Sequence, residues 1–290
     1  MKILFITSNR VGDAVLSTGL LDHLIKTHPD CAITVVCGPA AEGVFARMPN
    51  RTRTIAVEKR PRGAHWLHVW RSVVGTRWDL VIDLRASALS YLVRTRRRVL
   101  MRRLPGRRET PKTTQLGTIM GIEPPLPVAW FDAEDAALAD RLLPPGETLI
   151  ALGPTANWHG KIWPPERFIA LFRELGEARA VVLAGPGTAE RAMAAPVLAA
   201  LPEAIDLAGA LTLPQAAAVL ARCALFVGND SGLMHLAAAA GCRTLGLFGP
   251  TPHLEYGPSG PRAASVVSAD GTMAGLSVAV AVAAAKRLLA

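Results

Sequence analysis

Short apolar runs alternate with stretches of helical periodicity along the first half of the chain. The apolar runs are residues 2–7, 32–38, 54–57 and 79–84, and the helical stretches that follow them are 13–26, 40–47, 65–75 and 88–95. A strand followed by a helix, repeated several times, is typical of a parallel sheet with helices on both faces. The pattern therefore predicts an α/β fold.

The alternation is interrupted once and then restarts. Two Pro-rich pieces, PPLPVAWFD and LLPPGE, flank an acidic helical piece between about residues 124 and 146, as at a domain junction. The later apolar runs are 148–154, 180–187, 205–209, 225–230 and 244–250, and a last helix is expected at 276–289. We predict two Rossmann-like domains, residues 1–146 and 147–290, that face each other across a cleft.

Composition narrows the class of protein. The chain has 290 residues, 50% of them hydrophobic and 19% charged, which is typical of a globular protein with two sizeable cores. Its first apolar run is too short for a signal sequence and no run reaches membrane-spanning length, so we expect a cytoplasmic protein. The four cysteines, Cys31, Cys37, Cys223 and Cys242, have no metal-ligand spacing, and we expect neither a disulfide nor a structural zinc.

The positive charge is unevenly distributed. Residues 1–146 contain 22 lysines and arginines against 13 acidic residues, whereas residues 147–290 contain 10 of each. The segment 94–108, RTRRRVLMRRLPGRR, has eight arginines, and Lys59, Arg60 and Arg62 form a smaller cluster. Such clusters suit phosphate groups or an anionic membrane surface, but a solvated face or a nucleic-acid patch is also compatible with them. The long segment has no aromatic residue for base stacking, so we expect no nucleic-acid partner.

Ligands of parallel sheets bind at the carboxyl ends of the strands, which directs attention to the loops there. The loop at 7–18 places Asp13 at the start of a helix. A carboxylate in this position can take a proton from a hydroxyl nucleophile, or it can cap the helix, and the sequence leaves both roles open.

Three loops of the second half carry the remaining polar candidates. The loop at 153–168 contains Thr155 and Lys161, a mobile cation suited to phosphate. The Gly-rich turn at 183–192 contains Glu190, which can meet a ribose or belong to an empty tight turn. In FVGNDSGLMHLAAAAG, residues 226–241, a strand ends at a polar turn that opens a helix, and this turn suits either an anion or ordinary capping.

Taken together, the segments SNRVGDAVLSTGLLDHL, DLVIDL, KIWPPERF and NDSGLMHLAAAAGCRTLGLFGPT resemble glycosyltransferase family 9, the bacterial lipopolysaccharide heptosyltransferases, in the family's order and over nearly the whole chain. The resemblance implies the GT-B architecture and a nucleotide-sugar donor, ADP-heptose in characterised members. It also implies transfer with inversion at the anomeric carbon to a lipopolysaccharide core or related phosphorylated or lipid-linked acceptor. No metal or other cofactor is expected, in keeping with the lack of a convincing DxD motif.

The resemblance also implies roles for individual residues. Asp13 matches the family's general base, and the Arg-rich clusters would meet an anionic glycolipid acceptor through Lys59, Arg60, Arg62, Arg97 and Arg98. The donor site would comprise Thr155, Lys161, Glu190, Asp230, Ser231, Gly232 and His235. An acceptor linked to lipid would bring the protein to the inner face of the inner membrane as a peripheral protein.

Two alternatives remain open at this point. A GT-B transferase with a UDP- or GDP-hexose donor would use the same loops, because the base-recognition pocket is not readable from them. A non-catalytic nucleotide- or polyanion-binding protein would account for the basic first half. It would leave Asp13, Lys161 and the turn at Asp230 without a role.

Overall fold

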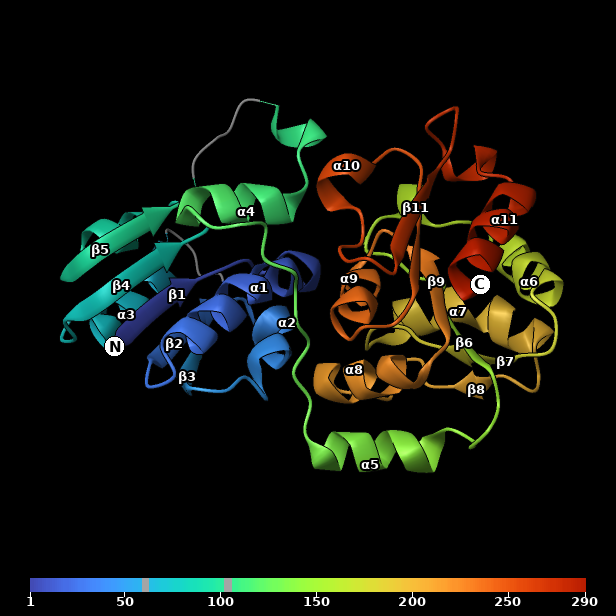
Figure 1. Ribbon diagram of the computed structural model, residues 1–290, viewed down its shortest axis with the longest axis horizontal. Coiled ribbons are helices and arrows are strands. Elements are labelled where there is room, and N and C mark those ends of the chain that lie inside the picture. Colours follow the sequence, from blue (N-terminus) through green and yellow to red (C-terminus); the bar gives the residue numbers. More distant parts are fainter. Residues whose placement is uncertain (59–62, 102–105) are drawn as a thin grey trace. The chain divides into compact units, whose positions relative to one another are not determined.

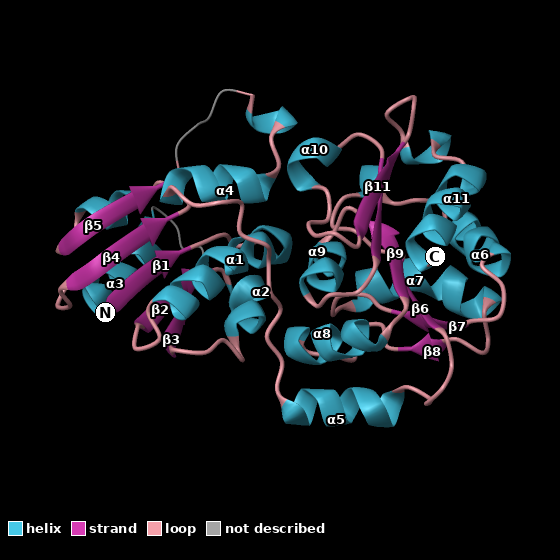
Figure 2. Cartoon of the chain, in the orientation of Figure 1, coloured by secondary structure: helices cyan, strands magenta, loops and turns pink. Residues whose placement is uncertain are grey.

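The computed structural model describes residues 1–58, 63–101 and 106–290, and the chain divides into two compact units, Met1–Trp130 and Phe131–Ala290 (Figure 1). Each unit consists of one sheet with helices packed around it (Figure 2). All strand pairs of both sheets are parallel. The prediction of two Rossmann-like α/β domains is thus confirmed.

The sheet of the first unit has the strand order β3-β2-β1-β4-β5. Its strands are β1 (Lys2–Ile6), β2 (Ala32–Cys37), β3 (Arg51–Ala56), β4 (Trp78–Asp83) and β5 (Thr95–Leu100). Its helices are α1 (Val11–Thr27), α2 (Pro39–Glu42), α3 (Ala64–Val73) and α4 (Lys112–Met120), with short 3₁₀ helices η1 (Gly43–Phe45), η3 (Ala88–Tyr91) and η4 (Arg107–Glu109). The order reverses between β1 and β4, so the loops after these two strands flank the topological switch point.

The sheet of the second unit has the order β11-β10-β9-β6-β7-β8, which is the order of dinucleotide-binding folds. Its strands are β6 (Leu149–Gly153), β7 (Arg179–Val182), β8 (Ile205–Asp206), β9 (Leu225–Asn229), β10 (Thr244–Phe248) and β11 (Ala263–Val267). Its helices are α5 (Ala133–Leu142), α6 (Pro165–Glu174), α7 (Thr188–Ala200), α8 (Leu213–Arg222), α9 (Gly232–Ala239), α10 (His253–Tyr256) and α11 (Val278–Leu289), with η5 (His159–Lys161) and η6 (Met273–Gly275). Here the switch point lies between β6 and β9.

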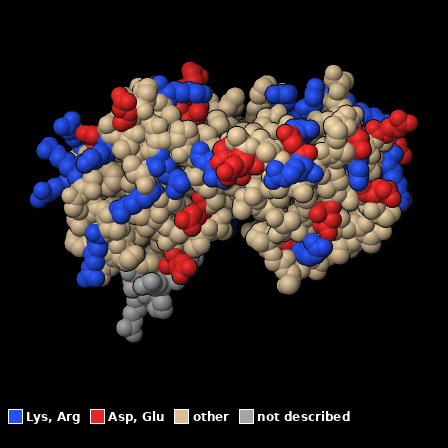
Figure 3. Space-filling model, turned by 90° about the horizontal axis from the view of Figure 1, so that it is seen from below, with Lys and Arg blue, Asp and Glu red and all other residues tan. Residues whose placement is uncertain are grey.

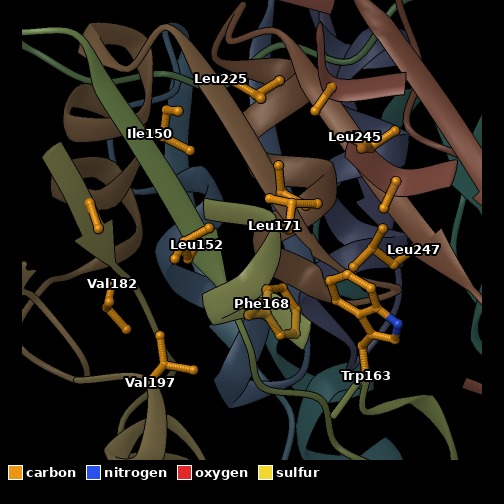
Figure 4. Packing of buried hydrophobic residues seen from close by; sticks show 14 of the residues in the cluster. Ile150, Leu152, Trp163, Phe168, Leu171, Val182, Val197, Leu225, Leu245 and Leu247 are labelled. Atoms are coloured by element: carbon orange, nitrogen blue, oxygen red, sulfur yellow. The ribbon is translucent and has the colours of Figure 1, made fainter. Parts of the chain in front are cut away.

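The central strands are buried on both faces, which explains why their sequences are continuous apolar runs. In the second unit, α6, α7 and α11 contribute to a core against β6, β7, β9 and β10 (Figure 4). Trp163 and Phe168 are fully buried in it, with ring centroids 5.1 Å apart in an edge-to-face arrangement, and the indole N–H of Trp163 donates to the carbonyl of Leu276. This packing fixes the end of the loop that follows β6.

The boundary between the units lies at Trp130/Phe131, not after residue 146. Helix α5 is the acidic piece between the two Pro-rich stretches, and it packs against α8 of the second unit. Asp132 begins α5 with a capping box, in which its carboxylate accepts from the amides of Glu134 and Asp135. The Pro-rich stretch before Asp132 is therefore the junction, whereas the second one follows a helix that already belongs to the second unit.

The segment 88–100 also differs from the prediction. Instead of a helix over 88–95, the chain forms η3 and then the edge strand β5, whose residues Arg96, Arg97 and Arg98 are exposed. An edge strand with charged side chains lacks the apolar run that marks a central strand, and these charges protect its free edge from pairing with another chain. The basic cluster was recognised in the sequence, but its strand was not.

Candidate functional site

Asp13 lies beside the switch point of the first unit. Helix α1 begins at Val11, with Arg10 at the N-cap position and no side-chain capping bond. Asp13 is in the first turn, is half-buried, and accepts a hydrogen bond of 3.2 Å from the hydroxyl of Ser8 to its Oδ2. The carboxylate of Asp13 therefore bonds to the Ser8 hydroxyl and does not serve as the side-chain cap of α1, one of the two roles that the sequence left open.

The loop after β4 adds a cation to the same edge of the sheet. Arg85 donates from Nη1 to Oδ1 of Asn9 over 2.7 Å, and its guanidinium carbon lies 5.3 Å from the centroid of the Trp66 ring. Asp83, fully buried, accepts from the amide of Arg85 and from the amide and hydroxyl of Ser87. Asp83 therefore fixes the turn that carries Arg85.

In the second unit, the switch point brings Lys161 and Asp230 together. Lys161 ends η5 in the loop after β6, and Asp230 directly follows β9. The ammonium group donates to Oδ2 of Asp230 over 2.7 Å, with side-chain exposures of 20% and 8%. Two residues 69 positions apart, both predicted to bind donor, thus form one ion pair.

The turn beside this ion pair contains buried polar atoms without a hydrogen-bond partner. Ser231 is the N-cap of α9, yet it makes no side-chain capping bond, and its buried Oγ has no partner among the described residues. The same holds for Nδ2 of the fully buried Asn229 and for Oγ1 of Thr251 after β10, whereas Oδ1 of Asn229 accepts from the amide of Trp163. Since buried polar groups are nearly always paired, three such atoms at the ends of β9 and β10 and in the turns that follow indicate a place for a polar ligand.

Glu190 and Thr155 lie together in the second unit. Oε2 of Glu190, in the first turn of α7, accepts from the hydroxyl of Thr155 and from the amide of Gly185, each over 2.7 Å. A Cβ on Gly185 would lie 2.8 Å from Oε1 of Glu190, so a side chain at this position would displace the carboxylate from its present place. The sequence predicted both residues for the donor site, and the structure joins them directly.

The remaining donor candidates, Gly232 and His235, lie in the helix that follows β9 in the second unit. Gly232 is the first residue of α9, and its N–H is one of those that a helix leaves without an internal acceptor. His235 is buried in the same helix, at 4% exposure.

Of the five acceptor candidates, the structure describes two, Arg97 and Arg98, and these two do not share a site. Lys59, Arg60 and Arg62 lie outside the described residues. Arg98 donates from Nε to the carbonyl of Ser90 and covers the ring of Tyr91, whereas Arg97 lines a cavity with His23 and Met120. As neighbours on one strand, Arg97 and Arg98 point to opposite faces of the sheet.

Four polar residues of the two switch points were missed in the sequence: Ser8, Asn9, Arg85 and Asn229. Arg85 follows the apolar run at 79–84 by one residue, and the rule that selected the other loops applies to it equally. Recognising its relation to Asp13 required knowing that β4 pairs with β1, which a chain separation of more than 70 residues conceals.

The cysteines are four buried free thiols. Burial raises the pKa of Cys37 and of Cys223 to about 12, with the Glu42 carboxylate adding to the effect at Cys37, and it raises the pKa of Cys242 further. The thiols of Cys37, Cys223 and Cys242 therefore stay protonated near neutral pH and are poor nucleophiles.

Two α/β units, each with polar loops at its switch point, define a class, the GT-B glycosyltransferase fold. Two solved structures share this fold over almost the whole chain. A family 9 glycosyltransferase from Veillonella parvula DSM 2008 superposes with a TM-score of 0.83 at 22% identity, covering 99% of this chain and 97% of that one. An Escherichia coli heptosyltransferase, WaaC, solved with ADP, gives a TM-score of 0.78 at 18% identity, with coverages of 99% and 100%.

The family follows from the sequence comparison. The profile of glycosyltransferase family 9 (heptosyltransferase) matches residues 120–279, more than half of the chain, and the chain belongs to this family. Curated relatives agree. Lipooligosaccharide heptosyltransferase 2 of Haemophilus influenzae is 26% identical over 299 residues, covering 87% of this chain and 84% of the relative. Lipopolysaccharide heptosyltransferase 2 of Escherichia coli K12 is 29% identical over 304 residues, with coverages of 88% and 86%. The chain is thus a glycosyltransferase, as the motifs predicted.

None of the described helices is both long enough and apolar enough to cross a membrane.

Proposed function

We propose that this protein transfers a heptose from ADP-heptose, with inversion at the anomeric carbon and without a metal, to a lipopolysaccharide core or a related phosphorylated or lipid-linked acceptor. Membership of the heptosyltransferase family supports the sugar, and its relatives among lipopolysaccharide and lipooligosaccharide heptosyltransferases support the acceptor class. The ADP bound to a relative of the same fold supports the nucleotide.

The main support for the proposed donor site is the ion pair of Lys161 with Asp230, which lies beside the start of α9, where no side chain caps the helix. Lys161 and the amides around Gly232 provide positive charge at one place, where the diphosphate of a nucleotide sugar would bind. The unpaired hydroxyl of Ser231 and the amide of Asn229 offer further donors. Asp230, bound to Lys161 in the free protein, would then be available to the hydroxyl groups of the sugar.

Asp13 is the proposed general base. The acceptor hydroxyl attacks the anomeric carbon, a new C–O bond forms on the face opposite the phosphate, and the hydroxyl proton passes to the carboxylate of Asp13. The bond from the anomeric carbon to the phosphate oxygen breaks, and its electron pair leaves with the nucleoside diphosphate. Ser8, which donates to Oδ2 of Asp13, orients the carboxylate so that Oδ1 can receive the proton.

Negative charge grows on the departing diphosphate, and the proposed reaction places Lys161 and the start of α9 there to stabilise it. Loss of one preorganised donor of this kind costs roughly two to three orders of magnitude in rate. With a cation and backbone amides in this role, transfer should be unchanged when divalent ions are removed. Full activity in excess EDTA is the expected result, and activity that EDTA abolishes and Mg²⁺ restores would contradict this part of the proposal.

The test of the donor is calorimetric titration of ADP, UDP, GDP and CDP into wild-type protein and into Lys161→Ala. We expect ADP to bind most tightly, and Lys161→Ala to weaken ADP binding by about 10- to 100-fold, the loss of a hydrogen bond to a charged group. Arg173→Ala, a charge change on the exposed face of α6, is the matched control and should leave ADP binding unchanged. Tighter binding of UDP or GDP would mean that the donor carries that nucleotide instead of ADP. No binding of any nucleotide would contradict the proposed donor site.

A further inference from the structure

Arg85 has a cationic group that the first unit does not neutralise. No carboxylate of the described residues forms an ion pair with it, in contrast to Arg96, which lies 3.5 Å from Asp79. Its partners are instead the neutral side-chain oxygen of Asn9 and the face of Trp66. These contacts orient the guanidinium and leave its charge available to an anion.

The backbone around Arg85 is held in a specific conformation. Asp83 accepts hydrogen bonds of 2.9 Å from the amide of Arg85 and 2.8 Å from that of Ser87. Between them, Ala86 has a φ of 49°, a left-handed conformation that costs an ordinary residue free energy. A turn maintained in this conformation by a fully buried carboxylate presents Arg85 at a fixed place after β4.

The same short loop holds Arg85 and the proposed base. Ser8 donates to Asp13, and the next residue, Asn9, accepts from Arg85. Asn9 is itself seated closely, because a Cβ on Gly38 would lie 2.7 Å from its Cα and Cβ. Since Ile6 at the end of β1 pairs with Asp83 at the end of β4, the carboxylate and the guanidinium emerge at neighbouring strand ends.

We infer that Arg85 binds an oxyanion of the acceptor, a carboxylate or a phosphate group close to the hydroxyl that Asp13 deprotonates, and so determines which acceptors are used. This inference rests on the proposed function for the role of Asp13. Asn9 occupies one nitrogen and Trp66 covers one face, which leaves the other N–H groups of the planar fork for two oxygens of one anion. An acceptor without an anion at this position would leave the guanidinium unpaired.

The experiment compares acceptor pairs that differ only in this charge: a sugar-acid glycoside and its methyl ester, and a phosphorylated glycoside and its unphosphorylated form. We expect wild-type protein to favour one anionic member by about 10- to 100-fold in kcat/KM, the range for a hydrogen bond to a charged group. The pair that shows the preference identifies the anion as carboxylate or phosphate. Arg85→Gln should reduce the preference to within about threefold, and Arg85→Lys should retain part of it.

A merely structural role of Arg85 would lower kcat/KM equally for both members of a pair, and this outcome would overturn the inference. Arg71→Gln, an exposed change of the same charge on α3 of the same unit, should leave the preference intact. ADP binding to Arg85→Gln should match wild type within about twofold, because the proposed donor residues lie on the other unit.

A second readout separates this inference from the proposed function. The Nε–H resonance of Arg85 in ¹⁵N-labelled full-length protein, assigned by its loss in Arg85→Gln, is followed during titration with inorganic phosphate and with acetate in the presence of ADP. A saturable shift with either anion supports the site even if no sugar is transferred, in which case the proposed function alone fails. No shift with either anion, together with no charge preference in transfer, would remove the site.

Discussion

The two units place loops at the same topological position but equip them differently. In the first unit, the edge at β1 and β4 presents Asp13, whose one hydrogen-bond partner among the described residues is the Ser8 hydroxyl, and Arg85, bound by neutral groups. In the second unit, the corresponding edge at β6 and β9 joins its carboxylate and its cation in one ion pair, Lys161 with Asp230. The fold fixes where a site lies, and the side chains decide its chemistry.

The units differ in overall charge as well. Divided at Trp130/Phe131, the first unit has 21 lysines and arginines against 9 acidic residues, whereas the second has 11 against 14. Figure 3 shows several Lys and Arg side chains gathered on the first unit, at the left of that view. All the excess positive charge therefore belongs to the unit with the proposed base, which is consistent with an anionic acceptor there. The other unit has no such excess, and its proposed donor site pairs its cation, Lys161, with a carboxylate of the same unit.

The largest expected effect comes from removing the carboxylate of Asp13, which forms no ion pair with the described residues of the first unit. Asp13→Asn keeps the shape of the side chain but cannot accept the hydroxyl proton, so the rate of sugar transfer should fall by about 10²- to 10⁴-fold. The dissociation constant of ADP, measured by calorimetry, should stay within about threefold of wild type, since the donor loops are unaltered. Transfer close to the wild-type rate would exclude Asp13 as the base, and a large loss of ADP binding would place it in the donor site.

The ion pair of the second unit should respond differently, through stability. Lys161→Met leaves Asp230, whose side chain is only 8% exposed, without its partner, and we expect the free energy of unfolding to fall by about 1–3 kcal/mol. Adding Asp230→Asn should recover part of this loss, with an interaction energy of roughly 0.5–3 kcal/mol in the double-mutant cycle. Urea unfolding of the four proteins measures it.

The control for this cycle is Asp13→Asn, which breaks no ion pair among the described residues and should change the free energy of unfolding by less than about 1 kcal/mol. Additive effects of the two second-unit substitutions would show that Lys161 and Asp230 are independent in solution. The proposed contrast between the two units, an ion pair in the second and separate charged groups in the first, would then not hold.

The sequence was sufficient to predict the strands that are buried on both faces of a sheet. β1, β2, β4, β6, β7, β9 and β10 were all expected, because continuous apolar runs followed by helical periodicity leave few other arrangements. The edge strand β5 was missed because its outward residues are arginines. Residue 146 was chosen as the boundary because prolines stand at both ends of α5, and only the packing of α5 on α8 decides between them.

The candidate site was predictable as a set of loops but not as a set of contacts. Lys161 and Asp230 were each selected for the same ligand, yet nothing in the sequence pairs them with one another. Arg85 was missed for a related reason, since its importance depends on Asn9 and Trp66, which reach it from two other elements. Long-range neighbours of this kind arise from strand order, which periodicity alone does not determine.

The last ladder pair at each switch point offers a test of how closely the units are comparable. Ile6 pairs with Asp83 in the first unit, whereas Gly153 pairs with Gly228 in the second, under the ring of Phe226. A Cβ on Gly228 would lie 2.5 Å from the ring, so Gly228→Ala should overpack the core and cost about 1–3 kcal/mol of unfolding free energy.

Gly75→Ala is the matched control, because nothing lies within 4 Å of its added Cβ and its φ is not positive. Urea unfolding of both variants measures the difference. If Gly228→Ala is as stable as Gly75→Ala, the ring can move aside, and the glycine pair is not a packing requirement of the second switch point.

The smallest expected effect concerns one edge strand of each sheet, β5 in the first unit and β11 in the second. β5 has exposed arginines and lies next to Tyr91 and Leu92, which are 64% and 61% exposed, whereas β11 has the uncharged sequence AASVV. Basic and apolar side chains together suit the surface of an anionic bilayer, and each arginine near such a surface contributes about 1 kcal/mol. We therefore expect sedimentation with phosphatidylglycerol vesicles to decrease about fivefold in Arg94→Gln. It should not change in Arg262→Gln, an exposed arginine of the second unit.

Binding should be lost at high salt and on phosphatidylcholine vesicles, since screening and the absence of lipid charge remove the attraction. Equal effects of the two substitutions would show that the membrane does not distinguish the units, and the charge difference would then concern the soluble part of the acceptor alone.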